Sequence, residues 1–145
     1  MKNKKILLVD DNQADLALAT RAFSKLNFSK ELIVANDGVE ALAYLFGNND
    51  NNGCAPEDLP ALILLDLKMP RINGFEVLRE IRTADKTRLV PVVIFTSSGE
   101  ERDIIASHKL GANNYIQKPV KFSDFIEVIR QLLFSMNLHL PSATE

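Results

Sequence analysis

The feature that most constrains the fold of this chain is a set of short apolar runs with almost no alternation between apolar and polar residues. The runs span residues 6–9, 61–65 and 91–95, with a shorter one at 115–116 and a weaker one at 32–35. Runs of this length that are rich in Ile, Leu and Val are typical of strands in a parallel sheet covered on both faces. The sequence therefore predicts five short strands.

The segments between these runs carry apolar residues at the three- and four-residue spacing of helices that bury one face. Such spacing covers residues 16–26, 39–46, 75–81, 104–108 and 122–136. The faintest example depends on Ile104, Ile105 and His108. Strand and helix alternate along the chain, and right-handed crossovers fold such an alternation into an open sheet with helices on both faces. We predict a doubly wound α/β domain.

The composition is that of one globular domain. The chain has 145 residues, 46% of them apolar and 25% charged. These values exclude a disordered tail-type protein, a collagen-like chain and a disulfide-rich miniprotein. A net charge of −2 lacks the basic excess that binds nucleic acid or an anionic membrane surface, so we expect neither as a partner.

We expect the protein to be cytoplasmic. Its basic start, residues 1–5, is followed only by the apolar residues 6–9 before two acids, which is too short for the apolar core of a secretion signal. No run approaches the roughly 18 apolar residues of a membrane span. Cys54 is the single cysteine and cannot form an internal disulfide, which fits a reducing compartment.

Two segments match neither pattern. Residues 47–60 are rich in Asn, Gly, Pro and Asp, which predicts an exposed loop, longer than the roughly 2–6 residues of most such connections. The loop begins like a calcium-binding EF-hand, but Leu59 stands where the twelfth position needs Glu, so we expect no calcium there. Cys54 in this loop is expected to be an exposed thiol. Residues 137–145 are expected to form a short C-terminal tail after a domain that spans 1–136.

Polar side chains close four of the five predicted strands. They are Asp10 and Asp11 after the first strand, Asp66 after the third, Thr96 and Ser97 at the end of the fourth, and Lys118 after the fifth. Since ligands of open α/β sheets bind beyond the carboxyl ends of the strands, we expect these side chains to meet at one edge. A strand-end carboxylate often does no more than cap the next helix, but capping does not account for all four strands together.

The residue types at this edge suit one kind of chemistry. Asp10, Asp11 and Asp66 would raise one another's pKa when brought together, and a divalent cation removes that conflict. Carboxylates with a backbone carbonyl and water suit Mg²⁺, whereas the sequence has no cluster of Cys and His for zinc. Lys118 supplies a positive charge for a phosphoryl group and Thr96 a hydroxyl donor. We therefore predict Mg²⁺-dependent phosphoryl transfer to an aspartate, which forms an aspartyl phosphate.

The same residues lie in motifs that resemble the receiver domain of two-component response regulators. The motifs are residues 6–11, 64–70 with Gly74, 91–97 and 111–119, in the order and spacing of that family. The resemblance covers about residues 4–135. It implies a flavodoxin-like fold, a (βα)5 three-layer sandwich with the sheet order 2-1-3-4-5. It also implies a partner histidine kinase whose phosphohistidine donates the phosphoryl group.

The resemblance assigns the acceptor and the metal ligands. Asp66 matches the phosphoacceptor. Asp11 matches the direct Mg²⁺ ligand, Asp10 matches the acid that acts mainly through water, and the backbone carbonyl of Lys68 matches a further ligand. The side chain of Lys68 places a second cation beside the acceptor, and this cation is expected either to pair with a nearby acid or to slow hydrolysis of the phosphoryl group.

The resemblance also assigns the residues that bind the phosphoryl group and respond to it. Lys118 matches the lysine that pairs with the phosphoryl group, and Ser97 fits the need for a small side chain beside the acceptor. Thr96 and Tyr115 match the switch pair, in which the hydroxyl moves toward the phosphoryl group and the aromatic ring turns inward. The added charge is then expected to bias a two-state surface around the fourth helix and fifth strand.

Three features resemble the small response regulators paired with bacterial phytochromes, especially cyanobacterial ones. They are the loop 47–60, the sequence at 89–91 and the closing residues 138–142. They imply a phytochrome-type sensor kinase as the partner. Too few residues follow the last helix for a DNA-binding output domain. We therefore expect a stand-alone regulator whose output is contact with a downstream protein or transfer to a phosphotransfer protein.

The end of the last helix suggests a further contact. Leu133, Met136 and Leu138 extend beyond what the core of a receiver needs, which predicts an exposed apolar patch. A homodimer through the fourth helix, the fifth strand, the last helix and the tail is one expected use of this patch, and docking of another partner is the other.

Three other classes were weighed on the residues. A haloacid-dehalogenase-type phosphatase needs a general acid two residues after its nucleophile, where Lys68 stands. A flavodoxin-like redox carrier needs a Ser-, Thr- or Gly-rich phosphate loop, but residues 11–15 are too acidic for FMN phosphate. A receiver that is never phosphorylated has no need of the complete set of acids, hydroxyl and lysine. We therefore expect a signalling protein and not an enzyme, one that takes part only in its own phosphorylation and dephosphorylation.

Overall fold

The computed structural model describes residues 5–28, 31–48, 52–119 and 121–136. Within these residues, parallel strands form one five-stranded sheet in the order β2-β1-β3-β4-β5. In chain order the strands are β1 (Ile6–Val9), β2 (Leu32–Ala35), β3 (Leu62–Leu65), β4 (Val92–Thr96) and β5 (Asn114–Gln117). The sheet and its order confirm the predicted flavodoxin-like α/β fold.

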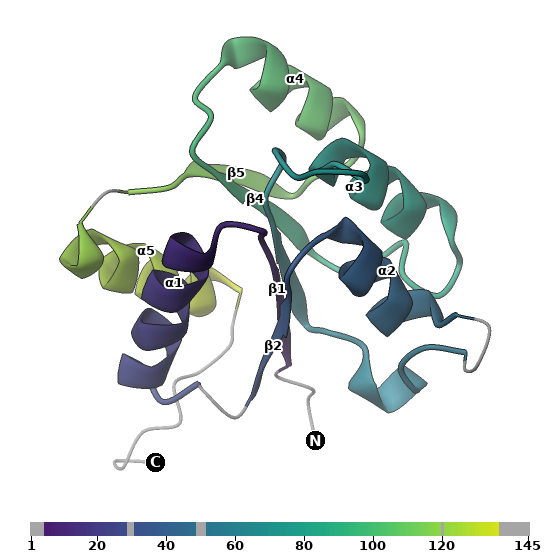
Figure 1. Ribbon diagram of the computed structural model, residues 1–145, viewed down its shortest axis with the longest axis horizontal. Coiled ribbons are helices and arrows are strands. Elements are labelled where there is room, and N and C mark those ends of the chain that lie inside the picture. Colours follow the sequence, from purple (N-terminus) through teal and green to yellow (C-terminus); the bar gives the residue numbers. More distant parts are fainter. Residues whose placement is uncertain (1–4, 29–30, 49–51, 120, 137–145) are drawn as a thin grey trace.

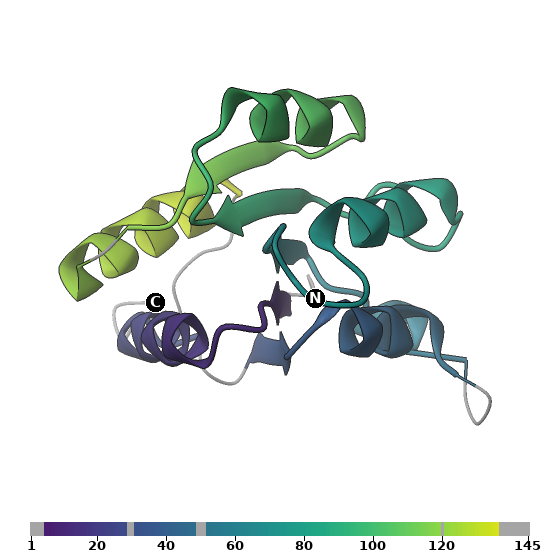
Figure 2. The ribbon, with the colours of Figure 1, turned by 45° about the horizontal axis from the view of Figure 1, so that its top comes forward.

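The helices cover both faces of this sheet (Figure 1). They are α1 (Gln13–Lys25), α2 (Gly38–Phe46), α3 (Gly74–Thr83), α4 (Glu101–Lys109) and α5 (Phe122–Ser135), and a short 3-10 helix, η2 (Pro56–Asp58), precedes β3. Helices α1 and α5 lie side by side on one face, and α2 and α3 lie on the other (Figure 2). None of the described helices is long and apolar enough to cross a lipid bilayer.

The central strands divide their side chains between two apolar layers. Leu8 and Leu64 pack in the layer under α1 and α5, whereas Leu7 and Ile63 pack in the layer under α2 and α3. Every position of β1, β3 and β4 is buried, which explains their unbroken apolar runs. Strands β2 and β5 form the edges of the sheet and are partly exposed, so their sequence signals are weaker.

Helix α4 exists where the sequence predicts it, but its buried face differs from the prediction. Ile104 and Ile105 are 41% and 48% exposed, whereas Asp103 and Ser107 are 6% and 1% exposed. His108 is exposed as well. The apolar spacing at 104–108 therefore marks the outer surface of this helix, and polar side chains occupy the inner face.

The loop 47–60 has more structure than its sequence suggests. The ammonium of Lys86 donates to the main-chain oxygens of Leu45 at 2.6 Å and Cys54 at 2.8 Å. The Tyr44 hydroxyl donates to the carbonyl oxygen of Asp58 at 2.8 Å. Cys54 is half-buried and packs against the core, and burial raises the pKa of its thiol. The expectation of an exposed thiol was therefore wrong.

The end of α5 buries more of its apolar side chains than the sequence predicts. Leu133 is fully buried, and the large apolar side chain left in solvent is Phe134, which is 83% exposed. Met136 is partly buried against the core. Leu138 and the rest of the tail, 137–145, lie outside the described residues.

Candidate functional site

The carboxyl ends of β1 and β3 bring three acids together. Asp10 and Asp11 follow β1, Asp66 follows β3, and each offers a carboxylate oxygen within 4.8 Å of the other two. Asp10 and Asp66 are 3% and 6% exposed. Neighbouring main-chain amides hold both buried carboxylates, since Asn12 donates to Asp10 Oδ1 at 3.0 Å and Leu67 donates to Asp66 Oδ1 at 2.8 Å. The structure thus gathers the acids that the strand ends predicted.

The ammonium of Lys118 lies among these acids. Its Nζ is 2.5 Å from Asp10 Oδ2, 2.9 Å from Asp15 Oδ2 and 3.4 Å from Asp66 Oδ2. The side chain is 5% exposed. Strand β5 sets its position, because the Lys118 amide donates to the carbonyl oxygen of Thr96 at 2.7 Å and so extends the pairing with β4.

Burial and neighbouring charges act in opposite directions on the pKa values of Lys118 and Asp10. Burial of Lys118 favours the neutral amine, but the neighbouring carboxylates outweigh burial and raise its pKa above the usual 10.5. Burial raises the pKa of Asp10 to about 6, against hydrogen bonds from Lys118 and Asn12 that lower it. A cation bound beside Asp10 would favour its ionised form and so oppose the effect of burial.

A hollow of about 480 Å³ opens over the acids. Its lining includes Asp11, Asp15, Asp66, Lys68, Ser97 and Lys118. These side chains come from the loops that follow four different strands and from the first turn of α1. Ser97 therefore shares one hollow with the expected acceptor, Asp66.

Thr96 and Tyr115 lie outside this lining. Thr96 ends β4 and is fully buried, with its hydroxyl oxygen 3.5 Å from the Ser98 amide that donates to it. The Tyr115 hydroxyl donates to the carbonyl oxygen of Ser98 at 2.8 Å. Ser98 thus connects both members of the expected switch pair to the loop between β4 and α4.

Lys68 pairs with an acid of α4. Its Nζ is 3.3 Å from Asp103 Oδ2, and the Ser98 hydroxyl donates to the same oxygen at 2.7 Å. The Ser98 hydrogen bond, together with the charge of Lys68, lowers the pKa of Asp103. Of the two fates expected for the Lys68 cation, the structure shows the pairing with a nearby acid. The loop after β3 is thereby joined to the start of α4.

The sequence and the fold match one family. Residues 6–130 match the response regulator receiver domain. This chain belongs to that family. The receiver is 37% identical to the response regulator Rcp1 of Synechocystis sp. over 127 residues, which are 88% of this chain and 84% of Rcp1.

Solved structures place this receiver near phytochrome-associated regulators. It resembles the crystal structure of the phosphorylated cyanobacterial phytochrome response regulator RcpA with a TM-score of 0.78 and 35% identity, over 97% of this chain and 100% of that chain. It resembles the Mn²⁺-bound form of Rcp1 with a TM-score of 0.78 and 36% identity, over 96% of this chain and 99% of that chain. The predicted family and its likeness to phytochrome-associated regulators are confirmed.

The acidic pocket of this receiver fits a divalent cation. Asp10, Asp11 and Asp66 offer hard carboxylate oxygens from a single edge of the sheet, which is the ligand type that Mg²⁺ and Mn²⁺ prefer. The hollow above them leaves room for water and for the oxygens of a substrate.

Sequence reasoning missed Asp15, Ser98 and Asp103. Asp15 lies in the first turn of α1, where its amide donates to the side chain of the N-cap residue Asn12 at 2.9 Å. Asp103 lies in the first turn of α4. An acid in a first turn ordinarily interacts with the helix dipole. No sequence pattern therefore indicated that Asp15 and Asp103 pair with distant lysines.

Proposed function

We propose that this receiver takes a phosphoryl group on Asp66 from the phosphohistidine of a histidine kinase. The observation that carries the proposal is the gathering of the carboxylates of Asp10, Asp11 and Asp66 around the ammonium of Lys118. In this proposal the three acids and the backbone carbonyl of Lys68 hold Mg²⁺. The likeness to RcpA and Rcp1 supports a phytochrome-type kinase as the donor.

The two carboxylate oxygens of Asp66 have different partners, and this difference suggests which oxygen accepts the phosphoryl group. Oδ1 accepts the hydrogen bond of the Leu67 amide, and Oδ2 lies 3.4 Å from the Lys118 ammonium. Oδ2 attacks phosphorus, the bond between phosphorus and the imidazole nitrogen breaks, and its electron pair stays on the departing imidazole, which takes up a proton from water. Lys118 places positive charge on the transferred oxygens. Mg²⁺, when bound, offsets the remaining negative charge on those oxygens.

The response to the phosphoryl group passes through the loop between β4 and α4. The group replaces about one negative charge by roughly two and adds acceptor oxygens. In this proposal Thr96 turns its hydroxyl toward these oxygens, and Ser97 leaves room for them. Tyr115 follows, because its hydroxyl is bonded to the main chain of Ser98 in the same loop.

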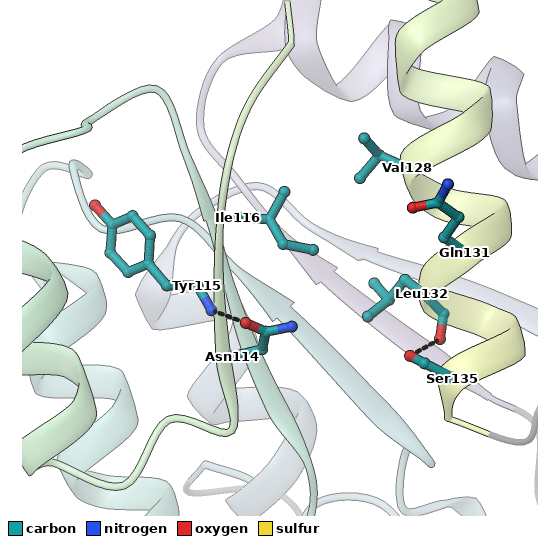
Figure 3. A pocket seen from close by; sticks show the side chains of 7 residues that line it. All are labelled: Asn114, Tyr115, Ile116, Val128, Gln131, Leu132 and Ser135. Carbon is teal, nitrogen blue, oxygen red and sulfur yellow. Dashed lines mark hydrogen bonds between the residues drawn. The ribbon is translucent and has the colours of Figure 1, made fainter.

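The output of this receiver is proposed to be a protein contact at α4, β5 and α5. Strand β5 is an edge strand of the sheet, and a groove of about 390 Å³ lies between it and α5 (Figure 3). Ile116 and Leu132 line the groove together with the polar Gln131. On the flanking helices, Phe134 and Ile105 are 83% and 48% exposed. An edge strand between two helices that each carry an exposed apolar side chain suits a second copy, which pairs the same surface across a two-fold axis.

The oligomeric state tests this surface. Light scattering after size-exclusion chromatography is expected to show a dimer for the wild type, at rest or with beryllofluoride, and a monomer for Phe134→Ser and Ile105→Glu. Glu80→Ser, a change on α3 away from the groove, serves as the control and is expected to keep the dimer. A wild type that stays monomeric in both states overturns the homodimer and leaves the surface to a downstream protein or a phosphotransfer protein.

Intact-mass analysis tests the acceptor. With Mg²⁺ and a small acyl-phosphate donor, the wild type is expected to gain a single phosphoryl group, and Asp66→Asn or added chelator abolishes the gain. Asp85→Asn is the matched control, since Asp85 is an exposed acid in the connection between α3 and β4. A gain that persists in Asp66→Asn moves the acceptor elsewhere. If neither phosphoryl group nor beryllofluoride binds, a receiver that works without phosphorylation is the better account.

Several broader expectations belong to the same proposal. The receiver is proposed to act only on its own phosphoryl group, so incubation with the phosphate ester p-nitrophenyl phosphate is expected to release no more product than incubation of the Asp66→Asn variant does. A cytoplasmic location, a receiver domain that spans residues 1–136, and no contact with nucleic acid or membrane stay predictions of the sequence. The lone thiol of Cys54 needs no oxidising compartment.

A further inference from the structure

The Lys118 ammonium is shared among acids from three different elements. Asp10 follows β1, Asp66 follows β3, and Asp15 belongs to the first turn of α1. An ammonium has three N–H donors, and three carboxylate oxygens lie at 2.5, 2.9 and 3.4 Å from Nζ. Because the lysine side chain is 5% exposed, these acids take the place of water around the charge.

Asp15 differs from the other two acids in one respect. Asp10 and Asp66 belong to the group of carboxylates whose oxygens converge within 4.8 Å, together with Asp11, and Asp15 does not. A divalent cation held by that group attracts the carboxylates of Asp10 and Asp66, which also contact Lys118. Asp15 is the partner of Lys118 that such a cation leaves in place.

The local structure of α1 fixes Asp15 for this contact. The Asp15 amide donates to the side chain of the N-cap residue Asn12 at 2.9 Å, which sets the first turn of the helix. Asn12 also donates its own amide to Asp10 at 3.0 Å. One short turn therefore places the carboxylates of both Asp10 and Asp15 within hydrogen-bond distance of the Lys118 ammonium, at 2.5 and 2.9 Å.

We propose that Asp15 is a positioning residue for Lys118, a role that rests on the proposed phosphorylation of Asp66. Asp15 holds the ammonium beside the acceptor while the metal ion draws on Asp10 and Asp66. One N–H of Lys118 then stays directed at the place where the phosphoryl oxygens arrive. Asp15 itself neither binds the metal ion nor touches the phosphoryl group.

Amine labelling of the metal-free protein tests the contact directly. Wild type, Asp15→Asn and Asp15→Glu are treated with trace acetic anhydride, and modification of Lys118 is read by peptide mass. Asp15→Asn is expected to label Lys118 several-fold faster, because a lysine that loses one of its ionic partners is held less firmly among the acids and meets the reagent more often. Asp15→Glu keeps the charge and labels close to the wild-type rate. Asp124→Asn, which removes an acid from the first turn of α5, is the control for the helix dipole and leaves Lys118 unchanged.

The rate of phosphoryl uptake tests the consequence. Asp15→Asn is expected to slow uptake from an acyl phosphate by about tenfold, less than the roughly hundredfold cost of a 1 Å misplacement, because Asp10 and Asp66 still contact the ammonium. The Mg²⁺ concentration for half-maximal uptake stays within about twofold of the wild type, because Asp15 is not a ligand. In the Lys118→Ala background, Asp15→Asn is expected to have no further effect, which is the signature of a residue that acts through Lys118.

The outcomes separate this proposal from the one on which it rests. A wild type that takes up no phosphoryl group overturns both. Normal wild-type uptake with unchanged or faster uptake in Asp15→Asn overturns only the role of Asp15. An equal slowing with and without Lys118 overturns it as well, because Asp15 then acts through the general charge of the site. Unchanged labelling of Lys118 in Asp15→Asn removes the contact on which the proposal is built.

Discussion

Gly74 begins α3 at a point where the helix touches the main chain that carries the acceptor. A Cβ atom at this position would lie 2.2 Å from the carbonyl oxygen of Asp66 and 2.7 Å from the Cα of Leu67. The Gly74 amide also donates to the carbonyl oxygen of Leu67 at 3.0 Å. Both close neighbours are main-chain atoms and cannot rotate away. Gly74→Ala must therefore move either the start of α3 or the loop after β3.

The size of that movement follows from the contact. Real Cβ atoms keep at least 3.0 Å from such neighbours, so Gly74→Ala needs a shift of about 0.8 Å. Overpacking of this kind costs about 1–3 kcal/mol in the free energy of unfolding. Because the clash is with the main chain of Asp66, the shift reaches the acceptor, and uptake from an acyl phosphate is expected to slow by up to about a hundredfold, as a shift near 1 Å does at a catalytic group.

Urea unfolding and intact-mass kinetics measure the two effects on the same preparation. Gly99→Ala is the control at the same edge of the sheet, since its nearest neighbour is the side-chain amide oxygen of Gln117 at 2.7 Å, the end of a flexible chain that can turn aside. We expect Gly99→Ala to stay within about 0.5 kcal/mol of the wild type. The reasoning is refuted if Gly74→Ala matches the wild type in both assays, or if Gly99→Ala loses as much.

Three further changes test the network of polar contacts by urea unfolding. Arg82→Met removes hydrogen bonds from the guanidinium to three acceptors at 2.8–2.9 Å and is expected to cost about 2–3 kcal/mol; a loss below about 0.5 kcal/mol would contradict this. Thr87→Val keeps the shape of a fully buried side chain but removes its 2.6 Å bond to the Ile81 carbonyl oxygen, at a cost of about 1–2 kcal/mol, and an unchanged midpoint would refute it. The pKa of Asp103 is lowered in the folded protein, chiefly by the Ser98 hydroxyl, so its stabilisation is present above the ordinary value of 3.8 and is lost as the pH falls through the folded value. The deficit of Asp103→Asn at pH 7 should therefore shrink below pH 3.8, and a constant deficit would argue against the assignment.

The sequence predicted those parts of the structure that depend on local apolar patterns. Strands β1, β3 and β4 are buried on both faces, so their unbroken apolar runs identified them, and the acids and lysine at strand ends met at one edge as expected. Strands β2 and β5 gave weaker signals because they form the edges of the sheet. The position of helix α4 was predicted correctly, but its buried face was not, because polar Asp103 and Ser107 occupy that face.

The parts that the sequence could not predict depend on partners far apart in the chain. Asp15 meets Lys118 from another element, and Lys68 meets Asp103 in the same way. Each acid also has an ordinary local use in the first turn of its helix. Composition and spacing cannot separate that use from a tertiary contact, so such pairs become visible only when the fold brings the elements together.

The anchoring of the loop 47–60 by Lys86 has a consequence for how this protein can change. The loop leads into the start of β3, so it lies at the opposite end of the strand from Asp66. Its attachment point, Lys86, belongs to the connection between α3 and β4. The Lys86 ammonium donates to the main-chain oxygens of Leu45, Asn52 and Cys54 at 2.6, 3.4 and 2.8 Å. Main-chain oxygens are present whatever the side chains are, so the loop can accept substitutions while its anchor persists. Replacing this loop with another sequence would thus leave the acidic pocket at the other end of β3 intact.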